Sequence, residues 1–359
     1  GIYIREMATT HEFYTGNTNA DHPDYPPGAP LWQYFFTLLP GYSEGAVYLA
    51  QFVLLITPLL VLFEKINVRQ WFWVPALLSL LALGLANFGH GIVSLYTDHI
   101  LSVWYAGVML QALSSSKTRL LEIGLLSMPL SVILLIKDAG LPLVASAVFL
   151  MACLLFYRNF REKKNFALNR TILITTIFLV MIPLMVQGAW RLNRSINEVP
   201  VGIGSGLIKG LLTGESRVQG LSDEEMQTYS QHFWDVIIDQ QLSKNTLMQN
   251  YNAYGYRLKR LFNDSHKMTP IYFIIFYTLF FIVIISLKFF HDRFEIFLLF
   301  FCGFITYIFH TLLLFLTFPL IFSPNEAINL GSFLRYFHIV TLPLFIFSIT
   351  IMSPAFTIS

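Results

Sequence analysis

Apolar stretches of roughly 20 residues recur along almost the whole chain, and they restrict the fold more than any other feature. A helix of that length crosses a hydrocarbon core of about 30 Å. The composition agrees, because 55% of the 359 residues are hydrophobic and only 12% are charged. A soluble domain carries about 25% charged residues. The sequence therefore predicts an all-α polytopic membrane protein.

The apolar stretches predict nine transmembrane helices, at about residues 44–63, 71–88, 99–113, 120–136, 140–157, 171–189, 269–287, 295–322 and 336–353. These spans divide the chain into four parts. They are an outer juxtamembrane segment with a proline-rich loop (1–43), six helices (44–189), a partly helical outer loop (190–268) and three helices (269–359). The chain begins at Gly1 without a signal peptide, and we expect at least one further span before it.

Basic residues in the short loops predict the orientation of the chain. Four clusters of them fall on one side of nine alternating spans, and they comprise Lys65, Arg69, Lys117, Arg119, Arg158, Arg161, Lys163, Lys164, Arg170, Lys288 and Arg293. That side is predicted to be cytoplasmic, which leaves the candidate chemistry on the other face. The small outer loop without cysteine favours a bacterial inner membrane with a periplasmic site. A net charge of +2 says nothing about nucleic acid, and the lack of a basic stripe predicts that nucleic acid is not a partner.

The most function-like run extends from His22 to Trp32 and carries four prolines. Because proline fixes φ and has no backbone donor, the run is predicted to be a stiff loop and not a helix. Such a loop would hold Asp21, His22 and Asp24 in fixed positions. The alternative is a simple linker whose acidic side chains are solvated.

Two polar pairs mark the outer ends of predicted spans. Asp98 and His99 open the third span and can bind a metal or move a proton. Alternatively, Thr97 or Asp98 serves as an N-cap of the helix. Lys137 and Asp138 separate the fourth and fifth spans. They offer a cation for a phosphate and an acid for a hydroxyl or metal, or they form a self-paired turn that reaches water. Charged groups at such depths are often functional.

A third polar pair, Arg335 and Tyr336, opens the last span. The guanidinium can hold a phosphate with two hydrogen bonds, or the pair can anchor the helix at the interface. Arg191 is open to both interpretations, with anchoring favoured. His310, inside the eighth predicted span, is interpreted as a packing residue, and His232 in the outer loop is a weaker candidate ligand.

Two shorter amphipathic helices are predicted outside the spans. Residues 2–15 carry alternating apolar and polar side chains, a pattern typical of a helix on the membrane surface. Ser222 and Glu225 form a capping box at the start of a helix from about Asp223 to Gln241. Its apolar stripe is expected to pack on the membrane domain.

The amphipathic stretch followed by His-Pro-Asp-Tyr-Pro-Pro-Gly-Ala-Pro-Leu before a span resembles the first outer loop of the GT-C fold glycosyltransferases. These include protein O-mannosyltransferases, the aminoarabinose transferase of lipid A and oligosaccharyltransferases. The resemblance extends over most of the chain in topology and over one short motif in sequence. It implies a polyprenyl-phosphate sugar donor, a lipid or glycan acceptor, contact with membrane lipids and, in some members, a divalent metal.

The resemblance also implies roles for individual residues. Asp24 or Asp21 matches the first-loop acid, and Asp98 matches a second acid, with His22, Asp24 and Asp98 as metal ligands. Lys137, Arg335 and Arg191 would hold the donor phosphate. The substrate contacts would be Tyr25, His99, Asp138 and Tyr336. Many members place the key aspartate directly after a first span that this chain lacks, which leaves open that the principal base precedes Gly1.

Three alternatives accompany this interpretation. A transporter or flippase of lipid-linked saccharides would place polar residues at mid-membrane depth in broken helices. A ligase or polymerase of undecaprenyl-diphosphate glycans would suit the long outer loop. A non-enzymatic subunit would bind its partner through residues 190–268 and would not depend on the acidic side chains.

Overall fold

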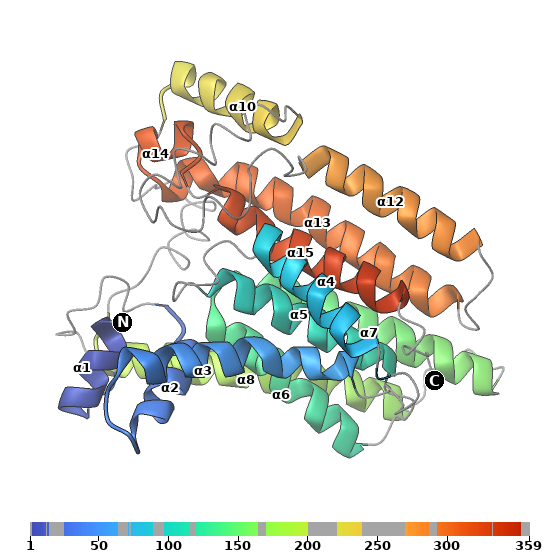
Figure 1. Ribbon diagram of the computed structural model, residues 1–359, viewed down its shortest axis with the longest axis horizontal. Helices are drawn as coiled ribbons and strands as arrows, with labels where there is room; N and C mark the ends of the chain where they lie inside the picture. Colours follow the sequence, from blue (N-terminus) through green and yellow to red (C-terminus); the bar gives the residue numbers. More distant parts are fainter. Residues whose placement is uncertain are drawn as a thin grey trace.

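The computed structural model describes residues 2–11, 13, 25–63, 71, 73–88, 97–114, 120–163, 170–199, 221–238, 270–286, 293–331 and 333–352. These residues form helices and no strands (Figure 1). Each predicted span falls on a helix. The helices are α3 (Glu44–Ile56) with the 3-10 helix η1 (Thr57–Leu62), α4 (Trp73–Phe88), α5 (Asp98–Ser114), α6 (Leu120–Ile136), α7 (Gly140–Lys163), α8 (Arg170–Ile196), α12 (Pro270–Ser286), α13 (Arg293–Ile321) and α15 (Phe333–Met352).

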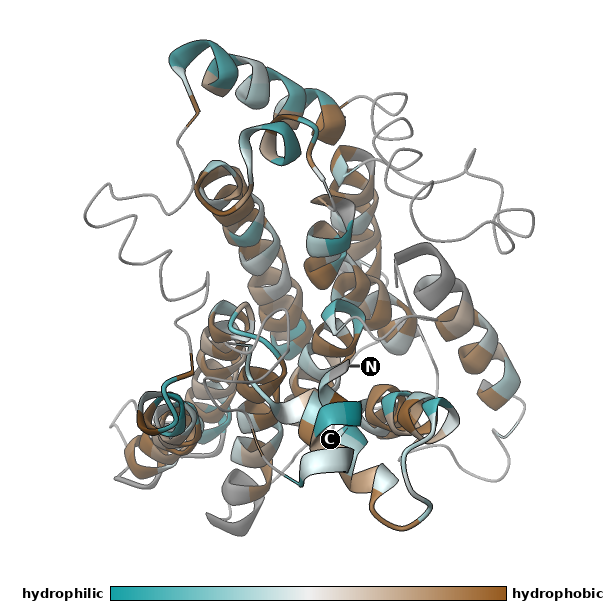
Figure 2. Ribbon diagram, turned by 90° about the vertical axis from the view of Figure 1, so that its left-hand side faces the viewer, coloured by the Kyte–Doolittle hydropathy of each residue, from teal (hydrophilic) through white to brown (hydrophobic). Residues whose placement is uncertain are grey.

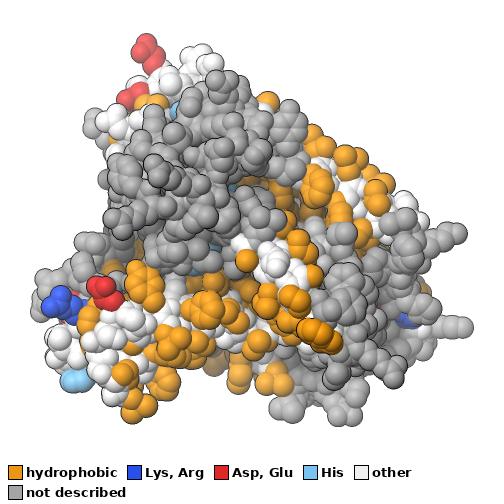
Figure 3. Space-filling model, viewed as in Figure 1, with side chains coloured by type: hydrophobic (Ala, Val, Ile, Leu, Met, Phe, Trp, Pro, Cys, Tyr) orange, Lys and Arg blue, Asp and Glu red, His pale blue; other side chains and the backbone are white. Residues whose placement is uncertain are grey.

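Four helical segments within the described ranges have the length and hydropathy needed to cross a membrane. They are Glu44–Leu62, Gly140–Arg161, Ile172–Ile196 and Arg293–Ile321. Large apolar side chains lie exposed on these helices and on α12, and Figure 3 shows them gathered over α3 and α12. Such extensive apolar surfaces are typical of lipid contact. The fold is thus that of an α-helical membrane protein, while the number of nine crossings stays a prediction.

Helix α5 lies at the centre of the bundle. Nearly all its residues are buried, and it packs on η1, α6, α7 and α15. It can be enclosed on all sides because apolar residues surround its axis without a dominant polar face. Gly107 permits close contact with η1, since a Cβ there would lie 2.6 Å from the Pro58 carbonyl oxygen.

The two ends of α5 meet different parts of the bundle. At its C-terminus, Arg158 of α7 donates to the Leu113 carbonyl at 2.9 Å and binds both carboxylate oxygens of Glu295 at the start of α13. Its N-terminus lies beside the α6–α7 turn and the start of α15. The helix ends that carry Arg158 and Glu295 and those that carry Asp98 and Lys137 therefore lie at opposite ends of the described helices (Figure 1).

The N-terminal region contains a predicted helix and one that the prediction excluded. Helix α1 (Ile2–Thr10) buries Ile4 and Met7 against Val47 of α3, as its amphipathic pattern indicates. Helix α2 (Gly28–Thr37) begins inside the proline-rich run. The prediction that this whole run is not helical was therefore wrong for Gly28 to Trp32. The reason is that Pro30 occupies the first turn, where a backbone N–H has no intrahelical acceptor to lose.

The outer loop contains the predicted capping-box helix. Helix α10 (Asp223–Ile238) starts with reciprocal bonds between Ser222 and Glu225, at 2.8 and 3.3 Å. Its buried face packs on α13 and on the short helix α14 (Pro324–Ile328), and Figure 2 shows its hydrophilic side facing outward. Helix α8 continues to Ile196, beyond the predicted end at 189.

Candidate functional site

Two of the polar pairs are fixed by the helix ends that carry them. Asp98 is the first residue of α5, and the Thr97 carbonyl accepts the first helical hydrogen bond from Leu101 at 2.9 Å. Lys137 lies in the tight turn between α6 and α7, where Gly140 donates to its carbonyl at 2.8 Å. A Cβ on Gly140 would lie 2.5 Å from the carbonyl oxygen of Ile133, so the turn requires glycine there. The backbone of both residues is consequently held in place.

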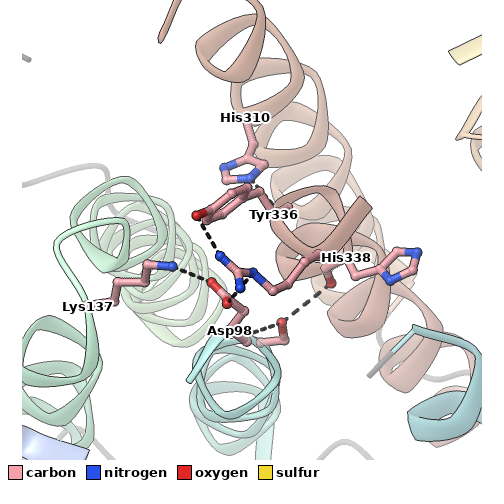
Figure 4. Close-up of polar contacts among 7 residues, drawn as sticks. Asp98, Lys137, His310, Tyr336 and His338 are labelled. Atoms are coloured by element: carbon pink, nitrogen blue, oxygen red, sulfur yellow. Dashed lines mark hydrogen bonds and ion pairs between the residues drawn. The ribbon is translucent and has the colours of Figure 1, made fainter. Parts of the chain in front are cut away.

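Asp98, Lys137, Arg335 and Tyr336 form one contact group, which we call the Asp98 cluster. The Lys137 Nζ lies 2.5 Å from Oδ1 of Asp98, and the Arg335 Nε lies 3.2 Å from Oδ2 (Figure 4). Arg335 also donates to the Tyr336 hydroxyl at 2.7 Å. The Tyr336 ring receives Lys137 Nζ at 4.7 Å from its centroid, within cation–π distance.

The cluster is buried but not neutral. The exposed fractions of the side chains are 3% for Asp98, 12% for Lys137 and 14% for Arg335. Burial alone would raise the pKa of Asp98, but Lys137 and Arg335 hold that pKa below its ordinary value. Burial alone would lower the pKa of Lys137, but Asp98 raises it above its ordinary value. All three groups are therefore ionised at neutral pH, and together they carry a charge of +1.

A second set of contacts holds the start of α15 against α5 and α13. The Ser102 hydroxyl donates to the Asp98 carbonyl at 2.9 Å and approaches the His338 carbonyl at 3.4 Å. The His310 Nε2 of α13 lies 3.0 Å from the Tyr336 carbonyl oxygen. These bonds fix the turn from which Arg335 and Tyr336 extend.

The C-terminal part of the proline-rich run reaches the cluster. The Tyr25 ring centroid lies 6.0 Å from Lys137 Nζ. Pro26 and Pro27 are buried, and Gly28 approaches Leu135 so closely that a Cβ would lie 2.7 Å from its carbonyl oxygen. The start of α2 is thus docked on the end of α6, directly before Lys137.

The remaining predicted site residues have varied positions. His99 is buried in α5, and Asp138 is half-buried in the turn beside Lys137. Arg191 is exposed on α8. Asp21, His22 and Asp24 lie outside the described residues.

The predicted metal site therefore stays a prediction. Within the described ranges, no group of three or more His, Cys, Asp and Glu side chains is arranged to hold a metal ion. Two of the three proposed ligands, His22 and Asp24, are not among those residues. The third, Asp98, has both carboxylate oxygens in ion pairs.

His310 is buried and its ring bonds the Tyr336 carbonyl, which fits its interpretation as a packing residue. Its place beside the Asp98 cluster could not be predicted from the sequence, because it depends on the packing of α13 against α15. His232 binds the Ile328 carbonyl at 2.6 Å, so it joins α10 to α14.

The chain was compared with protein-family models, curated proteins and solved structures, and no match was found.

Proposed function

We propose that this chain is a membrane glycosyltransferase with a GT-C-like fold. It would transfer a sugar from a polyprenyl-phosphate donor to a lipid or glycan acceptor. The observation that carries the proposal is the Asp98 cluster, in which two cations share one carboxylate at one end of the helices. Buried net charge is costly unless an opposite charge compensates it. An anionic ligand beside Lys137 and Arg335 would provide that compensation.

The chemistry of sugar transfer suits these cations. When the bond between the sugar C1 and the phosphate oxygen breaks, negative charge develops on the departing polyprenyl phosphate. Fixed cations in a site with little water stabilise that charge strongly. Arg335 can bind phosphate oxygens directionally, while Lys137 acts as a point charge.

Asp98 suits a positioning role better than a role as a base. Its two oxygens bind Lys137 and Arg335, and those cations hold its pKa below the ordinary value. A carboxylate with a lowered pKa is a weak proton acceptor. In this proposal Asp98 holds the two cations in position. The first-loop acids Asp21 and Asp24 stay candidates for contact with the acceptor. A bound divalent metal also stays part of the proposal.

The test uses the purified full chain in lipid nanodiscs. Undecaprenyl phosphate carrying labelled glucose, mannose or arabinose serves as donor, with release of polyprenyl phosphate as the readout. We expect turnover with at least one donor, and a loss of about 100-fold or more in Lys137→Met and Arg335→Met. Arg293→Met, on an exposed residue at the opposite end, is the control and should retain full turnover. Equal activity in all three variants would contradict the proposal.

One observation favours the transporter alternative. Tyr105, Ser146 and Thr306 form a hydroxyl triangle deep in the bundle, with oxygen–oxygen distances of 3.0, 3.2 and 2.6 Å. Polar side chains at such depth are expected along a transport path. These hydroxyls bond to one another and thereby join α5, α7 and α13, which suits helix association equally well. Movement of a fluorescent undecaprenyl-phosphate lipid between leaflets of proteoliposomes, without release of sugar, would support transport instead.

A further inference from the structure

We infer that His310 is the proton acceptor of this site, using its Nδ1 atom to take the proton from the acceptor hydroxyl. The inference rests on the proposed function and assigns to one residue a step that the Asp98 cluster does not supply. It starts from the position of the ring beside Tyr336 (Figure 4).

The tautomer of His310 is fixed by its hydrogen bond to the backbone. A carbonyl oxygen only accepts hydrogen bonds, so the Nε2 atom, 3.0 Å from the Tyr336 carbonyl oxygen, carries a proton. In the neutral ring this leaves a lone pair on Nδ1. A second proton on the ring would add a positive charge near the Lys137 ammonium. The charges of Lys137 and Asp98 both act on the ring.

The Nδ1 atom is buried and has no hydrogen-bond partner among the described residues. His310 as a whole is 4% exposed. A buried acceptor without a hydrogen bond costs about 1–3 kcal/mol, and structures rarely retain one without a reason. Hydrogen bonding to a substrate hydroxyl is a reason that fits the neighbouring cations.

The reaction step balances within this arrangement. The acceptor oxygen forms a bond to the sugar C1, and the bond from C1 to the phosphate oxygen breaks. The polyprenyl phosphate leaves with the bonding electron pair beside Lys137 and Arg335. The proton of the acceptor hydroxyl passes to Nδ1 and then to water or to the released phosphate.

Two substitutions each keep one hydrogen-bonding position of the ring but remove the base. In His310→Gln the side-chain amide can still donate to the Tyr336 carbonyl, but no base remains at the Nδ1 position. In His310→Asn the amide oxygen can replace Nδ1 as an acceptor but cannot take a proton. His232→Gln, on α10, is the matched control because that ring bonds only outside the cluster at Ile328.

We expect both His310 variants to lose about 100-fold or more in kcat while KM for the donor changes little. The wild type should also lose activity at acid pH, where a protonated ring accepts no proton, and residual activity of His310→Gln should lack this limb. The pH at which this loss begins will depend on the charged groups around the site, which are Lys137, Asp98 and Arg335. Full activity in His310→Gln, with an unchanged pH profile, would overturn the inference.

A readout without turnover keeps this result separate from the proposed function. In protein labelled with ¹⁵N-histidine, the Nδ1 resonance of His310 should be that of an unprotonated nitrogen at neutral pH. If the wild type releases no polyprenyl phosphate from any donor, the proposed function fails. If the wild type and His310→Gln release polyprenyl phosphate at equal rates, only the role of His310 fails. A protonated Nδ1 at neutral pH would also overturn that role.

Discussion

The carboxylate of Asp98 touches two cations, so removing its charge should be more damaging than removing either partner. In Asp98→Asn, Lys137 and Arg335 would stay buried beside each other without an anion. We expect the free energy of unfolding to fall by about 3–5 kcal/mol. Lys137→Met should cost less, because Asp98 retains Arg335 at 3.2 Å. Denaturant unfolding of both variants in one detergent measures the difference, and equal losses would contradict the shared-carboxylate arrangement.

The same residues predict a pH dependence of stability. Folding lowers the pKa of Asp98, so its contribution is present above the ordinary carboxyl pKa and is lost as pH falls through the folded value. Folding raises the pKa of Lys137, so its contribution is present below the ordinary ammonium pKa and is lost as pH rises through the folded value.

The stability difference between wild type and the double variant Asp98→Asn/Lys137→Met, which lacks both titrating groups, should therefore be constant from about pH 5 to about pH 9. It should shrink in stronger acid, where Asp98 becomes protonated, and above that range, where Lys137 loses its proton. Thermal unfolding across the pH series is the measurement. A difference that changes steadily near neutrality would show that another group controls it.

Single residues of the site were predictable, whereas their partners were not. Asp98, Lys137 and Arg335 were each recognisable as charges at the ends of apolar stretches, where burial is costly. Their ion pairs depend on which helices are neighbours, and the residues lie far apart in the chain. The alternative of a self-paired Lys137–Asp138 turn could not be judged from sequence, because only the packing of α5 on α6 and α7 brings Asp98 within 2.5 Å of Lys137.

At the scale of elements, the contact between α5 and η1 depends on a missing side chain. Gly107→Ala would place a Cβ 2.6 Å from the Pro58 carbonyl oxygen, so one helix must move. We expect a loss of about 1–3 kcal/mol in unfolding free energy. Gly188→Ala on α8 is the control, since nothing lies within 4 Å of the added Cβ and alanine favours the helix. A Gly107→Ala variant as stable as the control would contradict the close packing.

Apolar periodicity located the long helices but not their details. The prediction of a helix rested on the length and hydropathy of each apolar stretch, and all nine predicted stretches fall on helices. The helix at Gly28 was missed because proline was judged by its count and not by its position in the first turn. The change from α3 to η1 occurs at Thr57, next to Pro58, whose missing N–H weakens the regular α-helical pattern.

At the scale of the whole molecule, the two ends of the bundle should face opposite compartments. Leu39, 98% exposed after α2, belongs to the end that carries the cluster, and exposed Arg293 belongs to the end of the Arg158–Glu295 pair. In a background without Cys153 and Cys302, an impermeant maleimide should label Leu39→Cys in intact cells. It should label Arg293→Cys only after permeabilisation. The reverse pattern would invert the predicted orientation.

The enclosure of α5 has a consequence for biosynthesis. Helix α15, one of the helices that enclose it, is the last described helix to leave the ribosome. Until then, the Asp98 end of α5 has neither Arg335 nor the α15 surface to cover it. The newly made protein must therefore hold a charged helix at the membrane through the synthesis of more than half of the chain. That interval is when membrane chaperones and quality-control proteases would have most access to it.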